Sequence, residues 1–234
     1  MIKYKLKQDL NYRLKPSLAG SPAGKLKKDA IIFVSERKRV IETVNKEKVD
    51  ITWGKFTINE KAFWISTKSK YVARDYGHDV ARDAIVVANE TVKKKKYHGS
   101  GTGKINCSKF VTKACQRAGV LDTDKEIWHK TSVNKESSKK TIGDVVGGYK
   151  DLKHYSWHKC HCTLAKIPKE HKREGTILVF NNNISVITNP DAKKTVIYNC
   201  NLSGKRYTKL SMIRKTSGIN WTRNVLAYGV PKVE

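Results

Sequence analysis

The sequence predicts two domains of different class: an all-β amino-terminal domain over residues 1–74 and an α+β carboxy-terminal domain over residues 75–234. The first stretch contains short β-type runs separated by Gly, Pro and Ser, with no helical period. The second begins with two helical stripes and ends with successive β runs, an order typical of helices followed by an antiparallel sheet. At 234 residues the chain is long enough to bury a sizeable core.

The charge of the chain predicts its kind of partner. It has 48 Lys and Arg against 21 Asp and Glu, a net charge of +27. Such a balance favours nucleic acid, an anionic membrane or an anionic polymer such as a Gram-positive cell wall. The lysines are scattered and no aromatic–basic motif accompanies them, so nucleic acid is the least favoured. No apolar run reaches the about 20 residues that cross a bilayer, so we expect no membrane insertion.

Five strands are expected in the first domain, where β-branched and aromatic residues cluster. These runs are Tyr4–Leu6, Leu10–Pro16, Ala30–Val34, Val49–Trp53 and Ala62–Ser66. The segment Ala19–Gly24 reads as a turn. The aromatic residues of these runs are expected in the core, because aromatic side chains dominate small cores. They are Phe33, Trp53, Phe63 and Trp64.

Three segments of this domain resemble bacterial SH3 domains. Leu10-Asn-Tyr-Arg-Leu-Lys-Pro-Ser stands where that family has Leu-Asn-x-Arg-x-x-Pro-Ser. Gly24–Lys28 resembles the lead-in to the next strand of the family, and Trp64–Val72 resembles its closing strand. The resemblance implies an SH3-like barrel that binds cell-wall peptides or glycans.

After the boundary segment Ala73–His78, two helices are expected. Asp79 is predicted to cap the first, which carries apolar residues at Val80, Ala81, Ala84, Ile85, Ala88 and Val92. A glycine-rich loop then leads to Cys107, behind which Phe110, Val111, Ala114, Cys115 and Ala118 recur at helical spacing. Gly119 is predicted to end this second helix in a left-handed conformation.

Cys107 is the candidate nucleophile. The unpaired N–H groups at a helix start favour the thiolate over the thiol. The alternative is an ordinary buried cysteine beside a helix cap, which is how free cysteine often occurs.

The residues around Cys107 resemble the active-site entry of NlpC-type cysteine peptidases, papain-like enzymes that cut bacterial cell-wall peptides. The resemblance rests on Tyr97-His-Gly and on Asn106-Cys-Ser-x-Phe-Val. It implies that Cys107 attacks the peptide carbonyl, that Tyr97 lines the site, and that Ser108 and a helix-start N–H lie at the oxyanion. The chain departs from the family pattern with Asn106 in place of Asp and Lys109 in place of Gly.

The sequence also predicts a sheet in this domain. Comparison with the family pattern shows that the catalytic histidine of the family is missing from this sheet. The expected β runs are Glu174–Phe180, Ile184–Thr188, Thr195–Cys200 and Val225–Val230. The family's histidine position falls on Asn183–Ser185, and no histidine follows His171. Asn199 falls where the family has the polar residue that orients the histidine.

A cysteine peptidase needs a group that takes the thiol proton, and His suits this because its pKa lies near neutrality. Three explanations stay open. Another histidine (His98, His154, His158 or His161) fills the site, the domain is catalytically silent, or the histidine has been replaced deliberately.

A cluster of soft ligands, His158, Cys160, His161 and Cys162, also suggests zinc. Structural zinc sites pair their ligands in two separate clusters, so we expect a strand here, and neither a metal nor another cofactor. The cysteines number five, with none before Cys107, which argues against a disulfide framework.

The sequence therefore predicts a peptidoglycan-degrading cysteine endopeptidase of lysin type, with peptidoglycan and anionic wall polymers as partners. The alternative is a wall-binding or assembly module with a silent peptidase domain. The amino end has no apolar signal region, so we expect release by lysis or carriage on a phage-like particle.

Overall fold

The structure is a computed structural model that divides into two compact units. It describes residues 1–93, 106–123, 125, 127, 141–180, 183–190, 196–199, 212–214 and 225–234. The first unit comprises Met1–Asp75 together with Val233–Glu234, and the second comprises Tyr76–Lys232. The last two residues, expected in the second domain, belong to the first unit because Val233 forms a β-bridge with Asp75.

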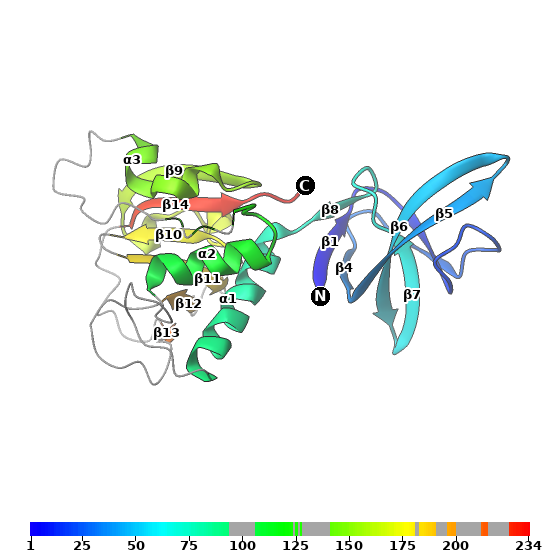
Figure 1. Cartoon of the computed structure of the whole chain (residues 1–234), viewed down its shortest axis with the longest axis horizontal. Helices are drawn as coiled ribbons and strands as arrows, with labels where there is room; N and C mark the ends of the chain where they lie inside the picture. The colour runs from blue at the N-terminus through cyan, green and yellow to red at the C-terminus, as the bar shows by residue number, and fades with distance from the viewer. Residues whose placement is uncertain are drawn as a thin grey trace. The chain divides into compact units, whose positions relative to one another are not determined.

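The first unit is all β (Figure 1). A three-stranded sheet has the order β4-β1-β8, and a five-stranded sheet has the order β3-β2-β7-β6-β5. The strands are β1 Ile2–Leu6, β2 Leu10–Arg13, β3 Gly24–Leu26, β4 Ile31–Val34, β5 Glu36–Val44, β6 Glu47–Ile58, β7 Lys61–Ser66 and β8 Val72–Arg74. The neighbouring strands in both sheets are antiparallel.

Three of these strands, β3, β5 and β8, were not among the five expected from the sequence. β5 is largely exposed and rich in charged residues, so it lacks the apolar run that marks a strand. It forms because Asn45 and Lys46, both with positive φ, turn the chain back so that β5 pairs with β6 along its whole length.

The hydrophobic core of the first unit lies on one face of its five-stranded sheet. Alternate residues of β6 and β7, such as Phe56, Phe63 and Ile65, contribute to it. The prediction of a buried Phe33 is wrong, because this side chain is 44% exposed. Trp53 is buried as expected, but outside this core cluster.

The second unit begins with two helices, α1 Tyr76–Lys93 and α2 Cys107–Arg117, followed by the short α3 Ile142–Val146. The prediction that Asp79 caps α1 is wrong, because the helix begins three residues earlier. Asp79 is instead buried in the first turn, where it pairs with Arg82 at 3.2 Å. The prediction that Cys107 begins α2 is confirmed, and Gly119 follows with a φ of +71°.

A six-stranded antiparallel sheet completes the second unit and makes it α+β. Its order is β13-β12-β11-β10-β14-β9. The strands are β9 Tyr155–Cys162, β10 Ile177–Phe180, β11 Asn183–Asn189, β12 Val196–Asn199, β13 Met212–Arg214 and β14 Val225–Pro231. Within the described ranges, a 3-10 helix at Gly147–Asp151 lies between α3 and β9, and two more, at Leu164–Lys166 and Lys169–His171, lie between β9 and β10. β13 was not expected from the sequence.

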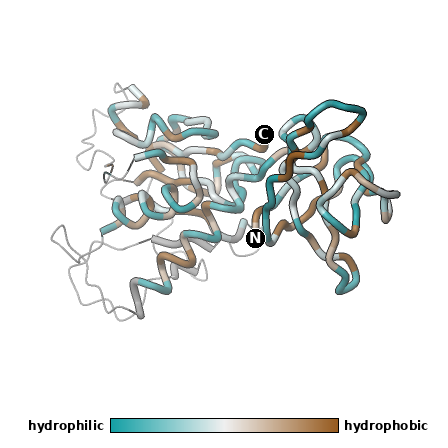
Figure 2. Tube along the Cα trace, turned by 45° about the vertical axis from the view of Figure 1, so that its right-hand side comes forward, coloured by the Kyte–Doolittle hydropathy of each residue, from teal (hydrophilic) through white to brown (hydrophobic). Residues whose placement is uncertain are grey.

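Both faces of this sheet are buried. Ile177, Val179 and Ile184 join the core shared with α1 and α2, which we call the helix-side core. Leu178, Ile187 and Tyr228 join a second cluster, the far-side core, which the segment around Leu164 covers. The central strands β10 and β14 are accordingly continuous apolar runs. Figure 2 colours the trace by the hydropathy of each residue.

None of the helices within the described ranges combines the length and apolar character needed to cross a membrane.

We predict that Gly175→Ala destabilises the second unit far more than Gly119→Ala. Both glycines have positive φ, at 78° and 71°, which costs an L-residue about 1 kcal/mol. A Cβ on Gly175 would also overlap the backbone of Gly77, whereas one on Gly119 would meet nothing within 4 Å. Backbone overlap should raise the loss in free energy of unfolding to about 3 kcal/mol. Urea denaturation of the two variants measures it, and equal losses would contradict the close approach of Gly175 and Gly77.

Candidate active site around Cys107

Cys107 is the first residue of α2, and its side chain is only 3% exposed. The helix begins here because Asn106 caps it, its side-chain oxygen accepting a hydrogen bond from the Lys109 N–H at 2.7 Å. The apolar stripe of α2 packs against β11 as part of the helix-side core. This packing fixes Cys107 beside the sheet.

A tyrosine from outside the helix anchors its first turn. The Tyr149 hydroxyl, on the 3-10 helix Gly147–Asp151, donates to the Ser108 carbonyl at 2.8 Å and lies 3.2 Å from the Thr112 hydroxyl. Both Tyr149 and Ser108 are fully buried. Because a buried hydrogen bond is costly to lose, Tyr149 holds the start of α2 in place. Sequence reasoning missed this residue, since its role depends on a contact 41 positions away.

Burial dominates the chemistry of the thiol. Loss of solvent raises the pKa of Cys107 above its ordinary value, since the charged thiolate is poorly solvated in an apolar core. The backbone N–H groups of Ile184, Ser108 and Cys107 itself oppose this rise, as does the Ser108 hydroxyl. The preference for thiolate expected at a helix start is therefore present but outweighed.

The strand β11 brings the predicted histidine position to the thiol. The Ile184 N–H acts on Cys107, and Ile184 lies within the segment 183–185 where the resemblance places the base. The next residue, Ser185, is fully buried, and its hydroxyl has no hydrogen-bond partner among the described residues. Ser185 is also the register partner of Asn199 on β12. Cys107 and the backbone of Asn199 thus flank the same strand.

Two of the predicted site residues lie wholly or partly outside the described ranges. Tyr97 is outside them, and so is the side chain of Asn199. The Ser108 side chain is fully buried and interacts with the Cys107 thiol. Its predicted contact with substrate stays a prediction.

Two described histidines have partners near the start of α1. The His78 Nδ1 lies 3.0 Å from a Glu174 carboxylate oxygen. His154 stacks on Tyr76 with ring centroids 3.8 Å apart. Both imidazoles are therefore held by contacts of their own.

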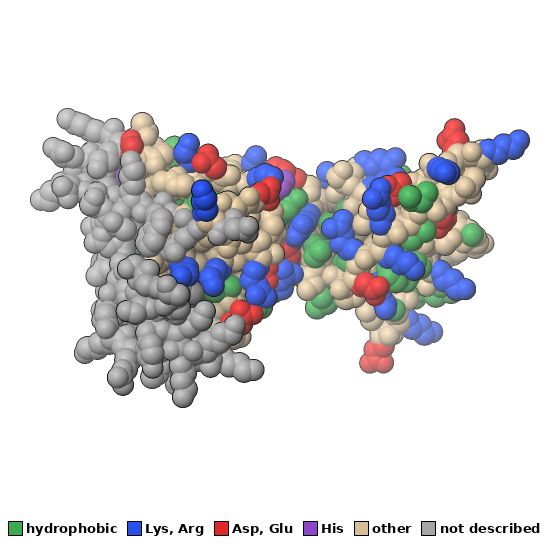
Figure 3. Space-filling model, viewed as in Figure 1, with side chains coloured by type: hydrophobic (Ala, Val, Ile, Leu, Met, Phe, Trp, Pro, Cys, Tyr) green, Lys and Arg blue, Asp and Glu red, His purple; other side chains and the backbone are tan. Residues whose placement is uncertain are grey.

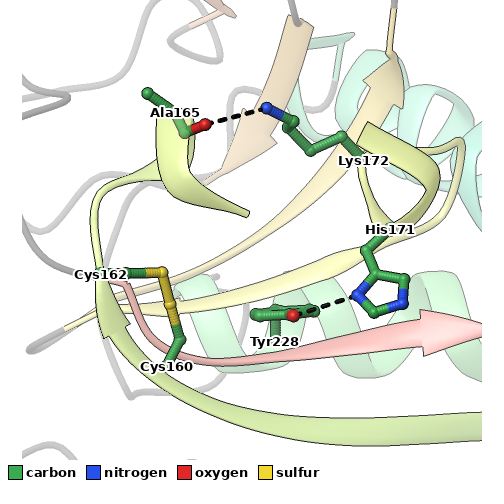
Figure 4. The surroundings of a disulfide bond; sticks show 6 residues. All are labelled: Cys160, Cys162, Ala165, His171, Lys172 and Tyr228. Atoms are coloured by element: carbon green, nitrogen blue, oxygen red, sulfur yellow. Dashed lines mark hydrogen bonds between the residues drawn. A yellow bond between two sulfur atoms is a disulfide. The ribbon is translucent and has the colours of Figure 1, made fainter. Parts of the chain in front are cut away.

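A second pair of histidines lies on the far side of the sheet from α2. His171 Nδ1 is 3.1 Å from the hydroxyl of Tyr228, a residue of the far-side core, as Figure 4 shows. His158 stacks on the same tyrosine with ring centroids 5.0 Å apart. Burial, and then the charge of His171, lowers the pKa of His158. The sheet separates these imidazoles from Cys107, so His158 is excluded as its base in this arrangement.

The cysteines near these histidines form a disulfide between Cys160 and Cys162, two residues apart on β9 (Figure 4). The sequence did not predict this bond. Within the described ranges, no group of three or more His, Cys, Asp or Glu side chains is placed to hold a metal ion. The remaining described cysteines, Cys107 and Cys115, are free and buried.

Comparisons with known proteins add little to this geometry. No protein-family model matches the chain, and no curated protein matches it. Among solved structures, the chain is similar to NlpC2 from Trichomonas vaginalis, with 12% identity, 91% of this chain and 70% of the other covered, and a TM-score of 0.27. At that level of similarity, neither the fold nor the activity of that protein can be carried over to this chain.

We predict that Cys107 reacts slowly with iodoacetamide at neutral pH. Because burial raises the pKa of Cys107, its thiolate fraction at pH 7 should lie below that of a free cysteine, whose pKa is about 8.5. The rate should increase as the pH rises through 9. Peptide mass spectrometry measures labelling at Cys107, with the Cys107→Ala variant as the blank. Labelling faster than free cysteine at pH 7 would show that a base pairs with the thiol.

Proposed function

We propose that this chain acts on bacterial cell walls, and that its second unit is a papain-like cysteine peptidase domain of NlpC type with Cys107 as the nucleophile. One observation carries the proposal: Cys107, at the start of α2, packs against β11 in the same core cluster as Ile184. A cysteine on a helix start beside an antiparallel sheet is the arrangement expected of this class. The motif around Cys107 supports the same assignment.

The described residues supply part of a peptidase site. Cys107 would attack the carbonyl carbon of a wall peptide, while the backbone N–H groups of Cys107 and Ser108 would stabilise the oxyanion. The resemblance assigns Asn199 to orient the base, although its register partner Ser185 alternates with Ile184 on β11, so the pairing puts the Asn199 position on the face of the sheet opposite Cys107. The base itself would be one of the remaining candidate histidines, His98, His154 or His161, of which His98 lies nearest to Cys107 in sequence.

The first unit would hold the chain on the wall, as the resemblance to bacterial SH3 domains implies. Lys and Arg side chains are spread over the visible surface of each unit (Figure 3). A net charge of +27 suits anionic wall polymers as partners. Delivery by lysis or on a phage-like particle belongs to the same proposal.

The second candidate is a wall-binding or assembly module whose peptidase domain is silent. It is favoured by the buried thiol with its raised pKa and by the placement of His158 and His171 on the far face of the sheet. In this case wall binding would remain and the chemistry would be absent.

Wall digestion distinguishes the two candidates. We predict that purified Gram-positive walls incubated with the protein release new peptide ends, detectable by mass spectrometry, and that Cys107→Ala abolishes the release. A nucleophile substitution of this kind removes several orders of magnitude of rate. His98→Gln should have the same effect.

Two control variants test whether a loss of activity reflects a loss of folding and not the removal of a catalytic group. Cys115→Ala removes a buried thiol from the same helix, and His171→Gln removes an imidazole from the far-side core. Both should keep activity. If the parent protein sediments with walls but releases no ends at any pH, the silent module is the right assignment.

A further inference from the structure

The five-stranded sheet of the first unit has a second face that carries a cavity of about 400 Å³. Along β6, Phe56 and Ile58 point to the hydrophobic core, whereas Val49, Ile51 and Trp53 line the cavity. This alternation is what a pleated strand requires. The cavity is therefore formed by the sheet itself.

Two buried polar atoms at this cavity have no partner. Trp53 is 2% exposed, and its Nε1 forms no hydrogen bond with any described residue. The buried hydroxyl oxygen of Ser66 is likewise without one. Trp53 and Ser66 are direct register partners on β6 and β7, so their side chains lie on the same face, and both line the cavity. A buried polar group left without a partner destabilises the fold, so a ligand that supplies the partner would be favoured.

The charges around the cavity are mostly positive. Arg13, Lys25 and Lys68 line it. The one lining carboxylate, Asp9, already accepts hydrogen bonds from the Lys28 N–H at 2.9 Å and from the Lys27 ammonium at 3.1 Å. The lining is thus rich in cations and donors, and its acid is neutralised by neighbours.

We propose that this cavity binds a small oxyanion, a carboxylate or a phosphate group, whose oxygen accepts hydrogen bonds from Trp53 Nε1 and Ser66. An indole N–H can only donate, so its partner must be an acceptor. The three cations select a charged acceptor over a neutral one. Val49 and Ile51 contact the apolar part of the ligand.

The two polar atoms are closed from bulk water, so side chains that line the cavity shift when the ligand enters. One Arg13 donor is bound to the Gly20 carbonyl at 2.6 Å, which ties the arginine to an exposed turn. Lys68 is the side chain that moves more easily. The site is independent of the chemistry at Cys107.

Nitrogen-15 labelling of the tryptophans tests this proposal. The chain has five tryptophans, so five indole N–H signals are expected, and Trp53→Phe identifies the relevant one. The ligands are N-acetylalanine, its neutral amide, and methyl phosphate, each raised to tens of millimolar. We expect the Trp53 signal to move downfield with at least one of the two anions and not with the amide. A shift with N-acetylalanine would identify the ligand group as a carboxylate, and a shift with methyl phosphate would identify it as a phosphate.

Charge variants give the matched comparison. Lys68→Gln should weaken anion binding about 3- to 10-fold, and Ser66→Ala by a similar factor. Lys55→Gln removes the same charge from the lysine over the Trp64 ring, outside the cavity, and should leave binding unchanged. The proposal is overturned if neither anion moves the Trp53 signal, if the amide moves it equally, or if Lys55→Gln weakens binding as much as Lys68→Gln. None of these outcomes bears on wall digestion.

Discussion

The packing of α2 against β11 is the constraint on which the second unit depends. It buries the apolar stripe of the helix, places Cys107 beside Ile184 and removes the thiol from water. The same contact has two opposite chemical effects: it aims backbone N–H groups at the sulfur and it deprives the thiolate of solvation. Because burial is the larger effect, the pKa of the Cys107 thiol is raised, and a paired base would be needed to form the thiolate near neutral pH.

The two cores of the sheet explain why the nearby histidines do not provide that base. Neighbouring residues on a strand face opposite sides, so His158 and Tyr228 lie with the far-side core while Ile184 lies with the helix-side core. Moving an imidazole from one side to the other would require a shift of strand register, which would expose both cores. His158 and His171 are therefore excluded as the base. His161 is not excluded, because it alternates with Cys160 and Cys162 on β9 and its buried Nε2 has no partner among the described residues.

Local patterns predicted the elements with strong periodicity and failed where tertiary contacts decide. The apolar spacing behind Cys107 and the position of Gly119 were enough to place α2, because both are local signals. β5 has no such signal, since its sequence is charged and it depends on pairing with β6. Cys107 could be identified from its motif, but the direction of its pKa shift could not, because burial is a property of the folded unit.

The cavity on the second face of the five-stranded sheet was missed in the sequence because Trp53 was expected to be a core residue. The alternation of Val49, Ile51 and Trp53 against Phe56 was the available clue.

Two residues with buried, unpartnered polar atoms have different surroundings, and this difference indicates which of them lies at a candidate binding site. Ser185 in the second unit and Trp53 in the first both carry a buried polar atom without a hydrogen-bond partner among the described residues. Ser185 sits on a strand whose two faces are both packed with apolar residues, and its register partner is Asn199, whose side chain lies outside the described residues. Trp53 lines a cavity with cations, beside a second unpartnered donor from its register partner. An isolated unsatisfied group indicates strain, whereas two that line one charged cavity indicate a missing ligand.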